Sequence, residues 1–172
     1  VIVTTSVGTA AMARASLPDL PLAFFITAAI AAALVPLVER VPRPRRWWAL
    51  SAAMAGLAVL TKGPVGVVVP AMVIGPMVWL VPRHRRPHVA TFALAAGVFL
   101  AVAAPWYAAM AAVHGTGYLE GFFVGDNLER FATTRFNDHR SVLFYLPIVA
   151  GGLMPWSPLG LVAWPSIREA VR

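Results

Sequence analysis

The chain has 172 residues and a formal net charge of +7, and 59% of its residues are hydrophobic. Its mean hydropathy of +0.74 is too high for an ordinary soluble domain. The arginines stand in short clusters between apolar runs rather than along one polar face, which excludes nucleic acid as a partner, and the absence of cysteine excludes disulfides and thiolate metal sites.

Apolar runs and short polar links alternate along the chain, and each long apolar run is predicted to cross a membrane as a helix. A crossing helix needs about 20 residues and must satisfy its backbone polar groups internally. Residues 1–13 are expected to end a first, partial membrane helix that enters from the cytoplasmic side, and residues 14–20 to form an outer turn. Full crossings are then expected over residues 21–38, 47–61, 65–81, 89–107 and 142–163.

The predicted fold class is therefore all-α: a polytopic membrane protein with about five full transmembrane helices, a partial first one and an amphipathic helix at the outer interface. Residues 1–172 are expected to form a single transmembrane domain, with residues 108–141 as its outer loop. No cleavable signal peptide is visible, and Val1 lies inside an apolar stretch. The chain is thus expected to be an internal piece of a longer protein.

The net charge lies entirely in every second link. Nine arginines and two glutamates within residues 39–46, 83–86 and 168–172 account for the whole +7, whereas the cations and carboxylates of the remaining segments cancel. Membrane proteins keep the Lys and Arg residues of short loops on the cytoplasmic side. The basic links are therefore predicted to face the cytoplasm, and any chemistry is expected at the neutral, outer ends.

Asp19 is the first candidate site residue, because it stands at the mouth of a predicted membrane helix, five residues after Arg14. A carboxylate there suits a metal, a sugar hydroxyl or a protonated base. The alternative is an exposed turn residue that follows Pro18 and pairs loosely with Arg14, a contact of small energetic value. Spacing alone favours this alternative.

Lys62 is the second candidate, since it is the only lysine beside thirteen arginines and lies in the turn Thr61-Lys62-Gly63-Pro64. A compact ammonium suits a phosphate oxygen, and Gly63 allows backbone to approach closely. The alternative is an interfacial lysine whose side chain extends to the lipid headgroups. The residues support both interpretations equally.

The third candidate is the long outer segment, in which apolar residues recur at helical intervals over residues 118–131. This pattern predicts an amphipathic helix at the membrane surface, on which Asp126 and Arg130 can pair. Its arginines could grip a phosphate, and an aspartate–histidine pair could supply a base or a metal ligand. The alternative is a solvated loop whose charges only keep it out of the bilayer. The polar residues concerned are Glu120, Asp126, Asn127, Glu129, Arg130, Arg135, Asp138, His139 and Arg140.

Several stretches, taken in order, resemble a known family. They resemble the bacterial polyprenyl-phosphate-dependent glycosyltransferases of the GT-C superfamily, the aminoarabinose-transferase-like and protein mannosyltransferase-like (glycosyltransferase family 39-like) enzymes. The resemblance runs through nearly the whole chain and is specific for the family but not for one substrate. The stretches are ARASLPDLPL at 13–22, GLAVLTKGP at 56–64, Pro105-Trp106-Tyr107, DNLERF at 126–131, His139 with FYLP at 144–147, and PWS at 155–157.

The resemblance implies a polyprenyl-phosphate-linked sugar donor, an acceptor that is lipid A, a protein or another glycan, and a site on the outer face of the bacterial inner membrane. By position, Asp19 resembles the family's second catalytic carboxylate, whereas Lys62, Arg130 and His139 resemble residues near the donor phosphate. A divalent metal, with Asp19 as a ligand, is left open, and no other cofactor is implied. Supporting residues would be Arg14, Asp126, Asn127, Arg135, Asp138 and Arg140.

The resemblance also implies a missing part. In this family the leading catalytic carboxylate lies in the first outer loop, upstream of this chain, so the piece is not expected to act alone. Three other functions stay open from the residues. A transporter fragment would carry ionisable residues within its spans and inverted repeats, a non-catalytic assembly subunit would tolerate changes at Asp19 and Lys62, and a flippase or ligase for lipid-linked glycans would share the basic outer loop.

Overall fold

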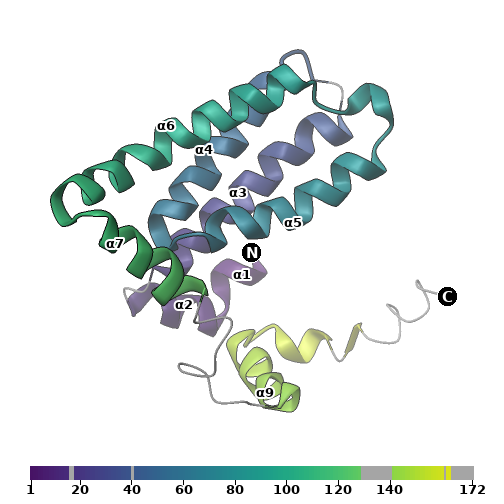
Figure 1. The fold of residues 1–172 in the computed structure, drawn as a ribbon. Helices are drawn as coiled ribbons and strands as arrows, with labels where there is room; N and C mark the ends of the chain where they lie inside the picture. Colours follow the sequence, from purple (N-terminus) through teal and green to yellow (C-terminus); the bar gives the residue numbers. More distant parts are fainter. Residues whose placement is uncertain (16–17, 40, 129–140, 161, 164–172) are drawn as a thin grey trace. The chain divides into compact units, whose positions relative to one another are not determined.

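The structure, a computed structural model, describes residues 1–15, 18–39, 41–128, 141–160 and 162–163. All regular structure within these residues is helical, so the predicted all-α class is confirmed for them (Figure 1). The chain divides into two compact units, one made of Val1–Leu20 with Asp138–Arg172 and the other of Pro21–Asn137. Helix α3 (Asp19–Val38) begins in the first unit and continues through the second.

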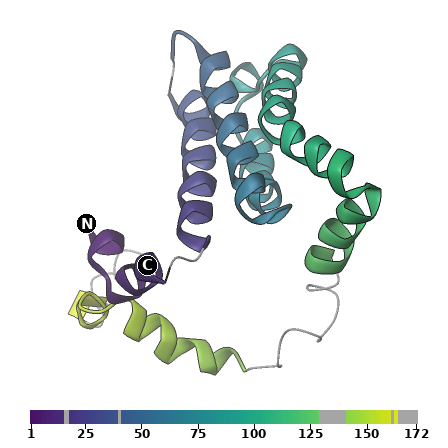
Figure 2. The ribbon, with the colours of Figure 1, turned by 90° about the vertical axis from the view of Figure 1, so that its left-hand side faces the viewer.

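Four helices run side by side with alternating direction in the second unit (Figures 1 and 2). They are α3, α4 (Pro44–Lys62), α5 (Val65–Leu80) and α6 (Val89–His114), and both α5 and α6 pack on α4. Pro44 occupies the start of α4, where a missing backbone N–H costs no helical hydrogen bond. The link between α5 and α6 contains the 3₁₀ turn η1 (Arg83–Arg85).

Small residues allow these helices to approach each other closely. Ala29 and Ala33 of α3 are fully buried, and the Ser51 hydroxyl of α4 donates a hydrogen bond to the Ala29 carbonyl oxygen over 2.8 Å. At the start of α5, a Cβ atom on Gly66 would overlap the backbone of Ala58 in α4. Contacts of this kind hold helices together in lipid, where burying a large apolar side chain gains little.

Two of the described helices, α3 and α6, are long and apolar enough to cross a bilayer. Helix α4 carries Arg45 and Arg46 in its first turn, and α5 has only 16 residues. The expected count of about five full crossings therefore stays a prediction. So does the assignment of residues 1–172 to a single transmembrane domain.

Helix α6 is longer than the sequence predicts. A helix end was expected at Tyr107, but α6 continues to His114 and contains Pro105 in its interior. Residues 108–113, between Tyr107 and His114, are mostly alanine, the strongest helix former, so the helix continues until Gly115. Gly115 has a φ of +79°, a left-handed conformation that ends helices and favours glycine. The predicted outer segment therefore begins at Gly115 rather than at residue 108.

The first unit differs from the predicted single helix over residues 1–13. Helix α1 (Ile2–Thr5) and helix α2 (Val7–Arg14) are separated at Ser6, which has an extended conformation with a ψ of 146°. The Ser6 hydroxyl donates to the Val3 carbonyl oxygen over 3.0 Å. Local side-chain bonding of this kind competes with helical backbone bonding and accounts for the break.

The predicted last helix over residues 142–163 is also interrupted. Helix α9 (Val142–Gly152) ends at a glycine and is followed by a turn that includes Pro155, which has no N–H to donate. The Met154 carbonyl oxygen in this turn accepts a hydrogen bond of 2.8 Å from the Val7 backbone N–H. Gly152 lies directly against Gly8, so α2 packs on the end of α9.

Candidate functional site

Lys62 is the last residue of α4 and lies exposed at one end of the second unit. Gly63 ends the helix with a φ of +86°, a conformation that L side chains rarely adopt. The Gly63 N–H donates to the Val59 carbonyl oxygen over 2.7 Å, which closes the last turn. The sequence predicts a turn over residues 61–64, and the structure has α4 continue to Lys62 and end at the buried Gly63.

Tyr107 joins α6 to this turn. Its hydroxyl donates a hydrogen bond of 3.1 Å to the same Val59 carbonyl oxygen that accepts from Gly63. The Tyr107 ring therefore lies within one helical turn of Lys62. Sequence reasoning did not assign Tyr107 a role in the site. The available signal was its hydroxyl within an apolar helix, since a buried tyrosine hydroxyl usually finds a hydrogen-bond partner.

An aromatic cluster extends from Tyr107 into the next segment, which comprises α7 (Thr116–Glu120) and the π-helix η2 (Gly121–Leu128). The Tyr107 ring centroid lies 5.1 Å from that of Phe123 and 5.9 Å from that of Phe122. Phe122 stacks on Tyr118 with ring planes only 8° apart. Helical structure was expected over residues 118–131 and is confirmed as far as Leu128. The beginning of the predicted outer segment thus lies at the Lys62 end of the helices.

The opposite end of the second unit is rich in arginine. The Arg85 guanidinium donates to the carbonyl oxygens of Leu37, over 3.3 Å, and Val38 at the end of α3. The Arg86 guanidinium bonds the carbonyl oxygens of Val81, over 3.2 Å, and Trp79, over 2.8 Å, at the end of α5. Cations stabilise the unsatisfied carbonyl oxygens at helix C-termini. Arg85 also draws the second basic link against the first, so both links meet at the end remote from Lys62.

Two further predicted site residues, Asp19 and Arg14, lie in the first unit and not in the second. Asp19 stands in the first turn of α3, where the helix dipole favours a carboxylate, and Arg14 is the exposed last residue of α2. Both belong to the first unit and Lys62 belongs to the second. A shared site that contains Asp19 and Lys62 therefore stays a prediction.

Most of the predicted phosphate-binding and supporting residues of the outer segment lie outside the described residues. Asp126 and Asn127 fall within η2, but the structure describes only the backbone of these two residues. Among the side chains that the structure does describe, no group of three could hold a metal ion together. The predicted roles stay predictions. The residues outside the described part are Arg130, Arg135, Asp138, His139 and Arg140.

Apolar surface identifies the class of protein. Large hydrophobic side chains point outward from the helices of the second unit; Trp79 and Leu80, for example, are 81% and 84% exposed. A soluble protein rarely exposes so much apolar surface. Ionisable residues, by contrast, gather at the two ends of the helices. This distribution is that of a helical membrane protein.

The chain belongs to the dolichyl-phosphate-mannose-protein mannosyltransferase family, whose family model matches residues 1–108. This finding confirms the family resemblance seen in the sequence. No solved structure matches the chain significantly.

Curated relatives from bacteria carry the name undecaprenyl phosphate-alpha-4-amino-4-deoxy-L-arabinose arabinosyl transferase. The chain is 33% identical to enzyme 1 of Sodalis glossinidius over 86% of its own length and 26% of the relative's. It is 35% identical to the Pseudomonas paraeruginosa enzyme over 65% of its length and 20% of the relative's. It is 34% identical to the Pseudomonas aeruginosa enzyme over 72% of its own length and 23% of the relative's. The chain thus spans about a quarter of the length of the curated relatives it matches.

Proposed function

We propose that the chain is part of a glycosyltransferase that moves a sugar from a polyprenyl-phosphate donor to an acceptor at the outer face of the bacterial inner membrane. Membership of the mannosyltransferase family and the names of the curated relatives support the reaction class. An aminoarabinose unit on undecaprenyl phosphate is the donor that these names favour. The acceptor is lipid A, a protein or another glycan.

The hydrogen bond from Tyr107 to the Val59 carbonyl oxygen is the observation that carries the choice of site. It brings the only lysine of the chain to the same end of the helices as the aromatic cluster on η2, and the basic links lie at the other end. Positive residues of short loops mark the cytoplasmic side, so the Lys62 end is the outer one. A donor whose tail lies in the bilayer would carry its phosphate at this level.

Lys62 has the role of stabilising the charge that develops on the departing polyprenyl phosphate. Preorganised cations aimed at developing charge are usually the largest single contribution to such a reaction. Asp19 has the role of orienting the acceptor hydroxyl or a metal ion, and the general base that deprotonates the acceptor lies elsewhere in the whole enzyme. Arg130 and His139 are proposed to complete the phosphate site from the outer segment.

Transfer by the full-length enzyme in lipid vesicles tests this assignment. The Lys62→Ala variant should lose about 100-fold in the rate of donor-dependent transfer, the usual size of effect when one electrostatic stabiliser is removed. Lys62→Arg should retain part of the activity, because it keeps the charge but not the compact ammonium.

Arg83→Gln is the matched control, since Arg83 is an exposed cation of the opposite link. It should leave transfer within about twofold of the wild type, as expected for a surface substitution away from the site. Near-native transfer by a correctly inserted Lys62→Ala variant would refute the phosphate role of this residue. Parallel assays with lipid A and with a protein acceptor would identify the substrate.

A further inference from the structure

A pocket of about 200 Å³ lies between the two basic links, at the end of the second unit remote from Lys62. Arg85 and Arg86 line it together with His84 and His88, and Glu39 is the one acidic residue among the described residues around it. The two links carry seven arginines against one glutamate in the sequence. The pocket is therefore a place of strongly positive potential, suited to an anion.

Arg85 stands in this pocket with part of its hydrogen-bonding capacity unused. Its terminal nitrogen Nη1 donates to the carbonyl oxygens at the end of α3, which fixes the guanidinium in place. Its Nε is shielded from solvent and has no acceptor among the described residues. A buried donor without a partner is costly, and so is a charge without compensation. Both observations indicate a negatively charged group that the described residues do not supply.

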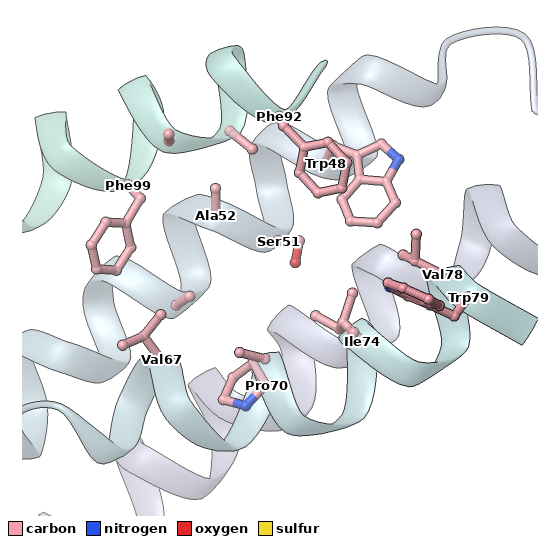
Figure 3. Close-up of a pocket in the computed structure, with 15 residues that line it drawn as sticks. Trp48, Ser51, Ala52, Val67, Pro70, Ile74, Val78, Trp79, Phe92 and Phe99 are labelled. Atoms are coloured by element: carbon pink, nitrogen blue, oxygen red, sulfur yellow. The ribbon is translucent and has the colours of Figure 1, made fainter. Parts of the chain in front are cut away.

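A second, apolar cavity of about 410 Å³ continues from this end between α4, α5 and α6. Figure 3 shows Trp48 and Phe92 at the end near the basic links and Val67 and Phe99 at the other. The groove is almost wholly apolar, because the hydroxyl of Ser51 is already bonded to the Ala29 carbonyl oxygen. An extended hydrocarbon chain is the kind of ligand that such walls accept.

Trp48 connects the two cavities, because its side chain lines both. The ring of Trp48 also contacts Phe92 of α6, with centroids 5.9 Å apart. A tryptophan at the boundary between charged and apolar surroundings is typical of the headgroup level of a bilayer. The two cavities together therefore fit one amphiphile, with an anionic head among the arginines and a hydrocarbon chain along the groove.

We propose that this end of the protein binds an anionic glycerophospholipid of the adjacent leaflet. Its phosphate lies beside Arg85 and Arg86, and one acyl chain occupies the groove between α5 and α6. A zwitterionic phospholipid would place a second, positive charge in a site that is already cationic, so the site selects lipids with a net negative charge. The proposal rests on the membrane location given under the proposed function but on none of the residues assigned to the phosphate of the donor.

Native mass spectrometry of the full-length protein, titrated with phosphatidylglycerol or phosphatidylcholine in a neutral detergent, tests the proposal. Phosphatidylglycerol should bind the wild type at least about fivefold more tightly than phosphatidylcholine, the effect of one unit of net lipid charge beside a cation at a membrane surface. Arg85→Gln should remove this preference, whereas Glu39→Gln should strengthen it. Equal binding of the two lipids by the wild type would overturn the proposal.

Two alanines of α6 provide a matched pair for the groove. Ala96 and Ala93 are both exposed, but only Ala96 lines the groove. Ala96→Phe should weaken phosphatidylglycerol binding at least about fivefold by filling the place of the acyl chain, and Ala93→Phe should leave it unchanged. The same affinity in both variants would show that the lipid does not enter the groove.

Lys62→Ala separates this site from that of the sugar donor. It should lower the rate of transfer about 100-fold and leave phosphatidylglycerol binding intact, whereas Ala96→Phe should impair lipid binding in a protein that still recognises the donor. A competition experiment then measures whether undecaprenyl phosphate displaces bound phosphatidylglycerol. If that lipid displaced phosphatidylglycerol and Lys62→Ala abolished the displacement, the groove would belong to the donor and the proposal would be wrong.

Discussion

The two ends of the second unit use their cations in different ways. At one end, Arg85 and Arg86 are bound to backbone carbonyl oxygens of α3 and α5, where they complete helix C-termini. At the other end, Lys62 extends from a glycine turn beside a group of aromatic rings. The Arg85 and Arg86 guanidinium groups are held by backbone acceptors, whereas Lys62 is an exposed residue at a helix end that Gly63 terminates. Cations thus fix helix ends at the arginine-rich end, whereas a glycine turn and an aromatic cluster shape the end at which we propose that transfer takes place.

Gly66→Val should have the largest effect, and it acts at the Lys62 end. A side chain at this position would overlap the backbone of α4, so α5 and the Lys62 turn must move apart. Overpacking usually costs about 1–3 kcal/mol, and the cost lies at or above the upper end here because the obstructing atoms are backbone and cannot rotate away. We expect a lower midpoint of thermal unfolding in detergent and a loss of transfer. Gly75→Val is the control, since no atom lies within 4 Å of an added Cβ there. Equal stability of the two variants would contradict the close packing of α4 and α5.

Arg86→Gln should have an intermediate effect and act at the other end. The substitution removes two charge-assisted hydrogen bonds to the end of α5, and because this end is partly exposed to solvent the two together contribute about 1.5 kcal/mol to stability. The free energy of unfolding should fall, while transfer by the protein that remains folded should be unchanged. Thermal unfolding and transfer measured on the same sample separate the two readouts. A loss of transfer per folded molecule would show that the two ends are not independent.

Tyr107→Phe should have the smallest effect on stability. It removes the hydrogen bond to the Val59 carbonyl oxygen, worth about 0.5–1.5 kcal/mol, and keeps the ring that contacts Phe122 and Phe123. Because the bond lies within a turn of Lys62, transfer should decrease by more than the change in stability implies. Tyr145→Phe is the control, since Tyr145 is exposed on α9. Identical transfer by the two variants would show that the Tyr107 hydroxyl does not support the proposed site.

The sequence predicted the arrangement of the links better than the ends of the helices. The basic clusters stand in every second link, and this alternation correctly predicts that the links around Arg43 and Arg85 lie at the same end of the second unit. Helix ends depend on local caps, which explains the error at Tyr107: the alanines after it continue the helix to Gly115. Ser6 broke a predicted helix for the same local reason.

The site itself was only partly predictable. The rarity of lysine pointed to Lys62, and its glycine neighbour explained the turn. The bond between Tyr107 and Val59 joins positions 48 residues apart, and no local pattern encodes such a pairing. The role of Asp19 depends on where the first unit lies relative to the second, and no motif in the sequence encodes that arrangement.

The Val59 carbonyl oxygen accepts two hydrogen bonds, and this has a mechanical consequence. A carbonyl oxygen has two lone pairs, and here Gly63 and Tyr107 occupy both, so the lysine turn and the aromatic rings are tied to a single atom. A substrate that displaced η2 would pull on Tyr107 and thereby loosen the support of the ammonium. In the proposed site, binding of the acceptor and stabilisation of the departing lipid phosphate would then be coupled through one backbone oxygen that links two helices.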